Sequence, residues 1–338
     1  MKYTTYSGLQ VILRTLGHYG VDNATLAKHG IQLPDVSDSG QHISPGLIEQ
    51  ILEYSIAEIG DEALPLKIAE HISPSTFGEF SIGLLTSHNL LHFLERVAKY
   101  YPYISTTQRL RTVRIRDQVF LLSLFAEKSM KPQIKQLWVE VAFAFIFRFM
   151  RLMGRPDFKP ASLDLERSVP PETAESYEKF FGIQPTFGSV RNSISFSLEA
   201  LEVPLANGGL DIAEEYERRI ISRIAEIDHT NLPRRVHAYI VAELPKRPLS
   251  KEIVASHFAM SVKTLQNKLV RSGTNYQKLL DHARHDLADI YLSFPEVTLA
   301  QIADMLGYSD ASNFCRAYKR WTGSVPRAKS LAKSAETA

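Results

Sequence analysis

The sequence predicts an α+β fold, mostly α, with two domains. An N-terminal α+β domain is expected over residues 1–230 and an all-α domain with two helix-turn-helix units over residues 231–330, followed by a flexible tail at residues 331–338. The 338 residues exceed the usual size of one domain. In the first part, the hydrophobic period changes from helical to strand-like and back, in an order typical of α+β proteins. After the polar segment 228–231 only helical patterns follow, and they include an internal repeat.

Helices are expected to open the N-terminal domain. Apolar residues at helical spacing predict one helix from Leu9 to Tyr19 and another from Leu90 to Tyr100. A third is predicted from Pro45 to Ile59, because Pro suits the first helical position and Ser44 can cap the helix.

A β-hairpin is expected next, since β-branched and aromatic residues dominate two neighbouring segments, Thr106–Arg116 and Val119–Phe125. The remaining elements of the domain are a long apolar helix, two strands with a short helix between them, and a closing helix. Their expected ranges are Pro132–Met153, Phe158–Leu165, Glu172–Phe181, Ser193–Leu198 and Gly209–Ile227.

The composition excludes a mainly disordered chain, a collagen-like repeat and a disulfide scaffold. Apolar residues at 44% and charged residues at 22% are ordinary for a globular chain, and a single cysteine, Cys315, cannot form an internal disulfide. The first residues lack the apolar core of a secretory signal. The most apolar run, Leu137–Met153, contains Glu140, Arg148 and Arg151, so we interpret it as a buried helix rather than a membrane span. A cytoplasmic location is expected.

Charge is distributed unevenly along the chain. Residues 232–338 contain 16 Lys and Arg against 9 Asp and Glu, a net charge of +7, whereas the preceding residues have a net charge of −5. A basic domain suggests a polyanionic partner, most commonly nucleic acid, although a basic surface without a partner would look the same.

An internal repeat lies in the basic domain, in the segments Ile253–Ser261 and Gln301–Ser309. Each copy has a small residue where two helices would cross, an apolar residue three positions on, and a small residue at a tight turn. These residues are Ala255, Phe258 and Ala259 in the first copy and Ala303, Leu306 and Gly307 in the second. The spacing is that of a helix-turn-helix unit.

The helix after each turn has a polar, basic face that could enter a major groove of DNA, where Gln and Asn read adenine, Arg reads guanine, and Lys and Arg bind phosphate. A helix with one apolar stripe, from Tyr276 to about Leu292, would hold the two units apart. The candidate DNA contacts are Val262, Lys263, Gln266, Asn267, Lys268, Ser312, Asn313, Arg316, Lys319 and Arg320.

These residues carry a family resemblance. The stretch Pro248–Arg327 resembles the DNA-binding domain of AraC/XylS-type bacterial transcription regulators, most specifically in Ile302–Asp310 and Asn313–Gly323. One departure is Asn267, where the family often has Arg, so a guanine contact there is replaced by an adenine or weaker contact.

The preceding domain resembles the non-cupin, arabinose-binding-like N-terminal domain of one branch of this family. The matching segments include Tyr100–Pro102, Tyr177–Gly182 and Arg191–Phe196. The resemblance implies a domain that senses a small-molecule effector, dimerises, or does both. It also implies promoter DNA and RNA polymerase as partners, with activation more common than repression, and no cofactor.

Candidate effector contacts are Arg109 and Arg111 on the predicted hairpin, which could grip an anionic effector, together with Tyr101 and Tyr103. A solvated strand face and an aromatic core or dimer interface are the alternative interpretations.

No catalytic or metal site is expected. The sequence has no phosphate-binding, dinucleotide-binding, zinc-protease or nucleophile-elbow motif. His282 and His285 lie at helical spacing but lack further ligands. Two other hypotheses stay open: an effector-independent DNA-binding protein, and a DNA-tethered enzyme with an unidentified activity.

Overall fold

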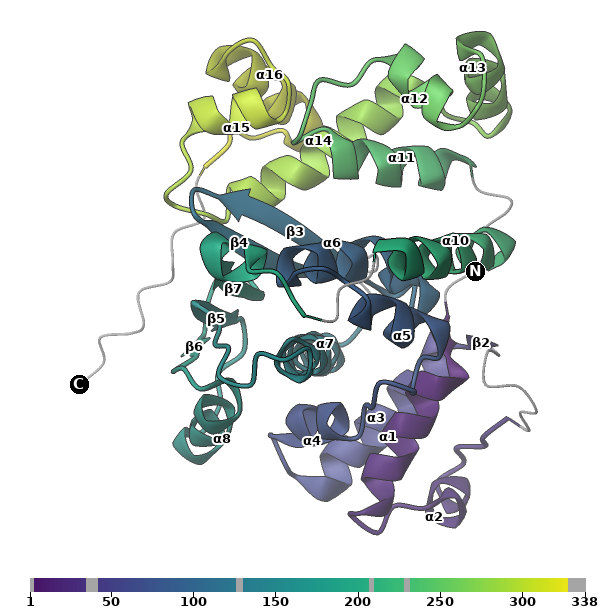
Figure 1. The fold of residues 1–338 in the computed structure, drawn as a ribbon, viewed down its shortest axis with the longest axis vertical. Helices are drawn as coiled ribbons and strands as arrows, with labels where there is room; N and C mark the ends of the chain where they lie inside the picture. Colours follow the sequence, from purple (N-terminus) through teal and green to yellow (C-terminus); the bar gives the residue numbers. More distant parts are fainter. Residues whose placement is uncertain (1–2, 35–41, 126–129, 207–209, 228–231, 328–338) are drawn as a thin grey trace. The chain divides into compact units, whose positions relative to one another are not determined.

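The computed structural model describes residues 3–34, 42–125, 130–206, 210–227 and 232–327, coloured along the chain in Figure 1. The chain divides into two compact units, Met1–Ala225 and Glu226–Ala338, called here the N-terminal and C-terminal units. The expected boundary at residues 228–231 and the expected tail at residues 331–338 lie outside the described residues.

Six helices precede the main sheet among the described residues of the N-terminal unit. Two of them have the predicted bounds, and both are capped by side chains. The Ser44 hydroxyl accepts a hydrogen bond from the backbone N–H of Leu47 at 3.3 Å, and Asn89 caps the other helix through the N–H of His92 at 2.7 Å. The helices are α1 Tyr6–Gly17, α2 Asn23–Lys28, α3 Pro45–Ile59, α4 Leu64–Glu70, α5 Glu79–Leu85 and α6 Leu90–Tyr100.

The predicted hairpin is confirmed and forms one side of a five-stranded sheet with strand order β3-β4-β7-β5-β6. The hairpin strands pair along their whole length, and the turn places Arg116 at φ 55°. The strands β5 and β6 are parallel, and the other pairs are antiparallel. The bounds are β3 Gln108–Ile115, β4 Gln118–Phe125, β5 Ser162–Leu165, β6 Thr186–Phe187 and β7 Ser193–Ser197; the short strands β1 Thr4–Thr5 and β2 His42–Ile43 pair separately.

The long helix α7, Pro132–Leu152, occupies the middle of the N-terminal core. Figure 1 shows it nearly end-on, between the sheet and the helices α3 and α4, both of which contact it. On the sheet side, the Gln108 side chain donates a hydrogen bond to the carbonyl of Trp138 at 3.3 Å. The helix is buried almost all round from Ile134 to Met150, which confirms the interpretation of the apolar run as a buried helix. Across the described ranges, no helix has the length and hydrophobicity needed to span a membrane.

One carboxylate of α7, Glu140, is buried within a polar network. It accepts hydrogen bonds from Arg167 Nε at 2.6 Å, Arg167 Nη2 at 3.0 Å, Gln136 Nε2 at 3.1 Å and the Tyr177 hydroxyl. A buried charge is tolerated when it is paired and hydrogen-bonded in this way. The network ties α7 to Arg167, two residues beyond the end of strand β5, and to the helix α8, Pro171–Phe181.

The last helix of the unit, α10, is held by the buried guanidinium of Arg96 on α6. Its Nη1 donates to the carbonyl of Gly83 at 2.5 Å and its Nη2 to the carbonyl of Ala213 at 3.1 Å. A Cβ on Gly83 would lie 2.9 Å from the Cβ of Tyr216, so only glycine permits this close approach of α5 and α10. The two closing helices are α9 Leu198–Glu202 and α10 Leu210–Ile227.

The described part of the C-terminal unit, residues 232–327, is entirely helical, as the sequence predicts. The central helix α14 buries Leu279, Ala283 and Leu287 along one stripe and contacts α11 and α16. The six helices are α11 Leu232–Glu243, α12 Lys251–His257, α13 Val262–Arg271, α14 Tyr276–Tyr291, α15 Leu299–Met305 and α16 Ala311–Thr322.

Candidate nucleic-acid interface

Two helix-turn-helix units are present, α12–α13 and α15–α16, and their turns have the same backbone pattern. The N–H of Met260 donates to the carbonyl of Ala255 at 2.9 Å, and the N–H of Tyr308 donates to the carbonyl of Ala303 at 2.8 Å. Both alanines are buried where the two helices cross. The equivalence of the two copies of the repeat is therefore confirmed at the level of individual hydrogen bonds.

The residue at each turn lies in the left-handed region of φ. Gly307 has φ 70°, as the sequence predicts, whereas the equivalent position in the first unit is Ala259 with φ 51°. A residue with a Cβ is strained in this conformation. The first turn therefore has a conformational free-energy cost that the glycine of the second turn avoids.

Side-chain caps fix the start of both second helices. The Ser261 hydroxyl accepts from the N–H of Thr264 at 3.1 Å, and Asp310 Oδ1 accepts from the N–H of Asn313 at 2.7 Å. The bond from this N–H, with one from Ser309, holds the pKa of the Asp310 carboxyl below its usual value. The first turns of α13 and α16 are thus well defined, and these are the turns that contact base edges in helix-turn-helix proteins.

Arg284 on α14 anchors the second turn to the linking helix. Its Nε donates to the carbonyl of Leu306 at 2.9 Å, its Nη2 donates to the carbonyl of Gly307 at 3.1 Å, and its guanidinium lies 4.4 Å from the centre of the Tyr308 ring. The sequence reasoning missed this residue, because its partners lie more than 20 positions further along the chain.

A second contact holds α16 against α14. The Tyr318 hydroxyl donates to Asp289 Oδ1 at 2.8 Å, and burial together with this bond raises the pKa of Tyr318 to about 12. The phenol therefore stays protonated at neutral pH and keeps its donor role.

Four of the five candidate contacts of α13 are exposed to solvent. Leu265 and Leu269 are fully buried, and Lys263 and Asn267 lie one turn apart on the opposite side of the helix. Lys263, Gln266, Asn267 and Lys268 are exposed, and Val262 is half-buried at the start of the helix.

The candidate contacts of α16 differ from one another in solvent exposure and in their hydrogen-bond partners. Ser312, Arg316, Lys319 and Arg320 are exposed, while Phe314 and Ala317 face the core. Asn313 is half-buried, and its side-chain amide donates to Ser309 Oγ and Asp310 Oδ2, both at 2.7 Å.

Both arginines of α16 contact other side chains. Arg316 Nη2 donates to Asn313 Oδ1 at 2.5 Å, so Asn313 positions Arg316 in this structure. Arg320 lies 3.4 Å from Asp281 of α14. From the sequence alone, both arginines were candidates for contacts to bases or phosphates. In the structure, each of them has a different side-chain partner.

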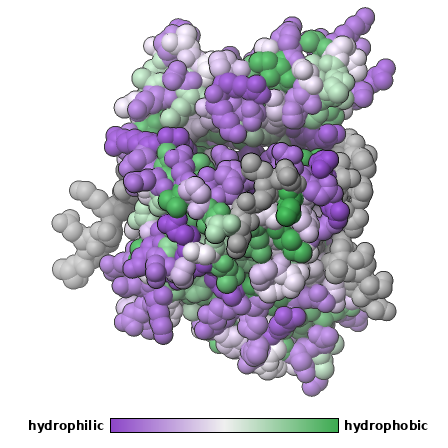
Figure 2. Space-filling model, viewed as in Figure 1, coloured by the Kyte–Doolittle hydropathy of each residue, from purple (hydrophilic) through white to green (hydrophobic). Residues whose placement is uncertain are grey.

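Hydrophilic side chains cover most of the surface that the C-terminal unit shows in Figure 2, with a few hydrophobic residues between them. Val270 on α13, 65% exposed, is one of the described large apolar residues that face solvent in this unit. A surface of this composition suits a wet, charged interface such as that with DNA.

The structure does not bring the four candidate effector contacts into one site. Tyr101 is only 5% exposed, and its hydroxyl donates to Gln108 Oε1 at 2.8 Å within the core. Tyr103 is half-buried and stacks on Phe80, with ring centres 5.8 Å apart. Arg109 and Arg111 are half-buried and alternate along β3 with Gln108, so their side chains lie on the other face of the strand. Among the described residues, no cluster of three or more His, Cys, Asp or Glu could hold a metal ion.

Together, the paired turns and the exposed basic helices define a helix-turn-helix DNA-binding protein. Residues 20–205 match the family model described as "Arabinose-binding domain of AraC transcription regulator, N-term", and residues 254–329 match a model described as "Helix-turn-helix domain". The first match covers more than half of the chain, so the protein belongs to the AraC family of transcription regulators, as the sequence resemblance implied.

Similar proteins carry matching descriptions. The "Ornithine utilization regulator" of Pseudomonas aeruginosa is 27% identical over 94% of this chain and 93% of its own length. The "HTH-type transcriptional regulator VirS" of Mycobacterium tuberculosis is 26% identical over 82% of this chain and 81% of its own. A crystal structure of the transcriptional regulator CdpR from Pseudomonas aeruginosa is similar over 93% of this chain and 95% of that chain, with 23% identity and a TM-score of 0.45.

Proposed function

We propose that this protein regulates transcription by sequence-specific binding of α13 and α16 to promoter DNA, under the control of a small-molecule effector. The observation that carries the proposal is the pair of capped helices whose polar faces are exposed and whose apolar faces are buried on a common scaffold. A single exposed polar helix is common, but two in matched units are typical of a protein that contacts two successive segments of a groove.

The candidate contacts of α13 would have different chemical roles at the DNA. Gln266 and Asn267 match the donor and acceptor pattern of adenine, and Val262 could contact a thymine methyl group. Lys263 and Lys268 provide charge for the phosphates on either side.

The contacts of α16 divide in the same way. Arg316, oriented by Asn313, has the forked geometry that pairs with guanine. Ser312 lies in the first turn and could reach a base or a phosphate. Lys319 and Arg320 lie in the last turn and provide phosphate contacts.

The partners follow from the family. We propose that the N-terminal unit binds the effector and supports a homodimer, that the bound protein contacts RNA polymerase as an activator, and that it works in the cytoplasm by binding rather than catalysis. The effector can act only if it binds the DNA-competent and DNA-incompetent states with different affinities.

The test begins with selection of random duplex DNA on the full-length protein, followed by titration of the selected site at several salt concentrations. Arg316→Ala is expected to cost about 1–3 kcal/mol and to relax the preference at one base pair. Lys319→Ala is expected to weaken all sequences alike and to lower the salt slope by about one unit.

Lys28→Ala serves as the matched control, since Lys28 is an exposed lysine of the N-terminal unit. It should leave the selected motif, the affinity and the salt slope unchanged. Binding that is weak and independent of sequence, or an Arg316→Ala protein with unchanged base preference, would contradict the proposed reading surface.

A further inference from the structure

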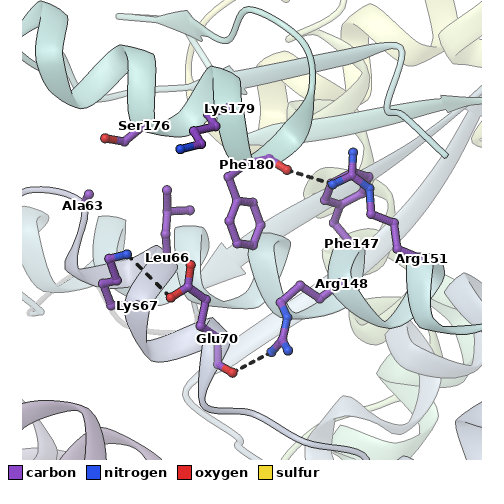
Figure 3. Close-up of a pocket in the computed structure, with 10 residues that line it drawn as sticks. All are labelled: Ala63, Leu66, Lys67, Glu70, Phe147, Arg148, Arg151, Ser176, Lys179 and Phe180. Atoms are coloured by element: carbon purple, nitrogen blue, oxygen red, sulfur yellow. Dashed lines mark hydrogen bonds and ion pairs between the residues drawn. The ribbon is translucent and has the colours of Figure 1, made fainter. Parts of the chain in front are cut away.

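The N-terminal unit has a pocket of about 480 Å³ between α4, α7 and α8. This volume lies within the range of small-molecule sites in proteins, roughly 300–1,000 Å³. Figure 3 shows side chains of all three helices around it, including Lys67 and Glu70 from α4 and Lys179 and Phe180 from α8. None of the four effector contacts suggested by the sequence lines this space.

The pocket has an apolar floor. Leu66 and Phe147 are buried, Phe180 and Ala63 are half-buried, and all four line the cavity. Phe147 and Phe180 come from different helices, and their ring centres lie 6.4 Å apart. Aromatic and aliphatic lining of this kind accommodates a hydrocarbon body.

The polar lining is strongly cationic. Lys67, Arg148, Arg151 and Lys179 line the pocket with a single carboxylate, Glu70. Lys67 Nζ lies 3.6 Å from Glu70 Oε2, and Glu70 also interacts electrostatically with Arg148, so four cationic side chains share the single carboxylate of the lining.

The two arginines are held in place by backbone carbonyls. Arg148 Nη1 donates to the carbonyls of Ala69 at 2.6 Å and Ile72 at 2.9 Å, at the end of α4. Arg151 Nη1 donates to the carbonyl of Phe180 at 3.1 Å, and its guanidinium lies 4.3 Å from the centre of the Phe147 ring. These contacts pre-organise both guanidinium groups, which lowers the entropy that a ligand must spend to order them.

Both guanidinium groups are also partly desolvated. Burial lowers the pKa of Arg148 and of Arg151, because the charged form loses contact with water. An anion that entered the pocket would compensate these charges, and a cation would meet the opposite effect.

We propose that this pocket is the effector site and that its ligand is a small organic carboxylate with an apolar body. The carboxylate pairs with the cationic rim, and the body packs against Phe180 and Ala63, the half-buried apolar residues of the lining. A ligand there bridges α4 and α8 across the central helix α7. This assignment rests on the proposed function, in which the N-terminal unit senses an effector.

Binding is tested by isothermal titration calorimetry on the full-length protein with phenylbutyrate and octanoate as probes. Phenylbutanol and octanol keep the apolar body without the charge, and phenylbutylamine reverses the charge. Each carboxylate is expected to bind at least tenfold more tightly than its alcohol, and phenylbutylamine is expected not to bind.

Exposed charges at the rim allow substitution without loss of folding. Lys67→Gln and Lys179→Gln should each weaken carboxylate binding about threefold, and the double variant about tenfold, as expected for exposed charges near an anion. Lys28→Gln is the matched control and should bind as the wild type does.

A second pair of variants tests the location by shape instead of charge. Ser176→Trp places a bulky ring in the pocket and should abolish binding, whereas Glu175→Trp puts the same ring on the neighbouring exposed position of α8, outside the lining. The Glu175→Trp protein should retain full affinity.

The outcomes separate this inference from the proposed function. If neither carboxylate binds, if the alcohols or the amine bind equally well, or if the Ser176→Trp and double Gln variants bind normally, the pocket assignment is wrong. The selection of DNA sites decides the proposed function independently, because it uses no effector probe.

Discussion

The two turns of the helix-turn-helix repeat invite a reciprocal exchange, Ala259→Gly in the first and Gly307→Ala in the second. Both positions have positive φ, 51° and 70°, but only one is a glycine. The exchange tests whether backbone strain at these turns contributes to stability, because each substitution changes one methyl group and no charge.

The magnitude follows from the local geometry. An L-residue in the left-handed region costs about 1–2 kcal/mol, and glycine loses about 0.4–1 kcal/mol through its greater freedom in the unfolded chain. Ala259 is exposed, so its methyl group contributes little packing. A Cβ on Gly307 would lie 3.6 Å from Arg284 Nη2, which is an ordinary contact. We therefore expect Ala259→Gly to stabilise the C-terminal unit, and Gly307→Ala to destabilise it, by roughly 0.5–1 kcal/mol each.

The assay uses the distribution of tryptophan. The chain has two, Trp138 on α7 and Trp321 on α16, one in each unit. In a Trp138→Phe background, Trp321 fluorescence during urea denaturation reports the C-terminal unit of the full-length protein. The midpoint should move upward for Ala259→Gly and downward for Gly307→Ala with an unchanged slope.

A lower midpoint for Ala259→Gly would refute the strain argument, since it would mean that the alanine stabilises the turn in a way the backbone angle does not reveal. As a control, Ala311→Gly at the start of α16 removes a methyl group from a residue outside the two turns. It should destabilise the unit by up to about 1 kcal/mol through helix propensity alone.

Three further predictions concern contacts that hold the fold. Arg284→Met should destabilise the C-terminal unit by about 1–3 kcal/mol and weaken DNA binding, measured by the same denaturation assay and by titration of the selected site, because two hydrogen bonds to the second turn are lost. Glu140→Gln should cost about 3 kcal/mol, followed by Trp138 fluorescence in urea, because it leaves the charge of Arg167 without its main partner; an unchanged midpoint would show that the network is not stabilising. Burial lowers the pKa of His92 to about 4, so the neutral ring is favoured in the folded state and stability should fall as the pH drops from about 6.5 toward 4. The loss should be about 1 kcal/mol, less than the full shift implies because the ring is partly exposed, and His92→Gln should flatten this part of the pH profile.

Long elements of this fold could be predicted because a long hydrophobic period repeats often enough to be recognised. The helices at Pro45–Ile59 and Leu90–Tyr100 have the predicted bounds, and each also has a capping side chain. Short elements such as Leu64–Glu70 and Leu198–Glu202 contain at most two turns, so they offer no period; tertiary packing decides that they are helical.

The candidate interface could likewise be predicted only in part. The exposed sides of α13 and α16 follow from the spacing of their buried residues, which the sequence displays directly. The roles of Asn313 and Arg284 depend on partners brought close by folding, and spacing alone does not reveal them. The sequence suggested Tyr101 as an effector contact, together with aromatic and cationic residues near it in the chain. In the structure, Tyr101 lies in a short 3₁₀ turn and its side chain is buried in the core.

The continuity of α14 has a consequence for the DNA that this regulator recognises. The helix runs unbroken from Tyr276 to Tyr291, about 24 Å at 1.5 Å per residue, and leads from one recognition unit to the other. The helix has no break between these residues, so the length of the α14 connection is fixed. With α13 and α16 as the proposed DNA contacts, operators should tolerate base changes between the two contacted elements but not a change in the number of base pairs between them. Five inserted base pairs would turn one element to the far side of the duplex, and ten would restore its direction but place it about 34 Å further away. The length of the spacer should thus be more constant among natural operators than its sequence.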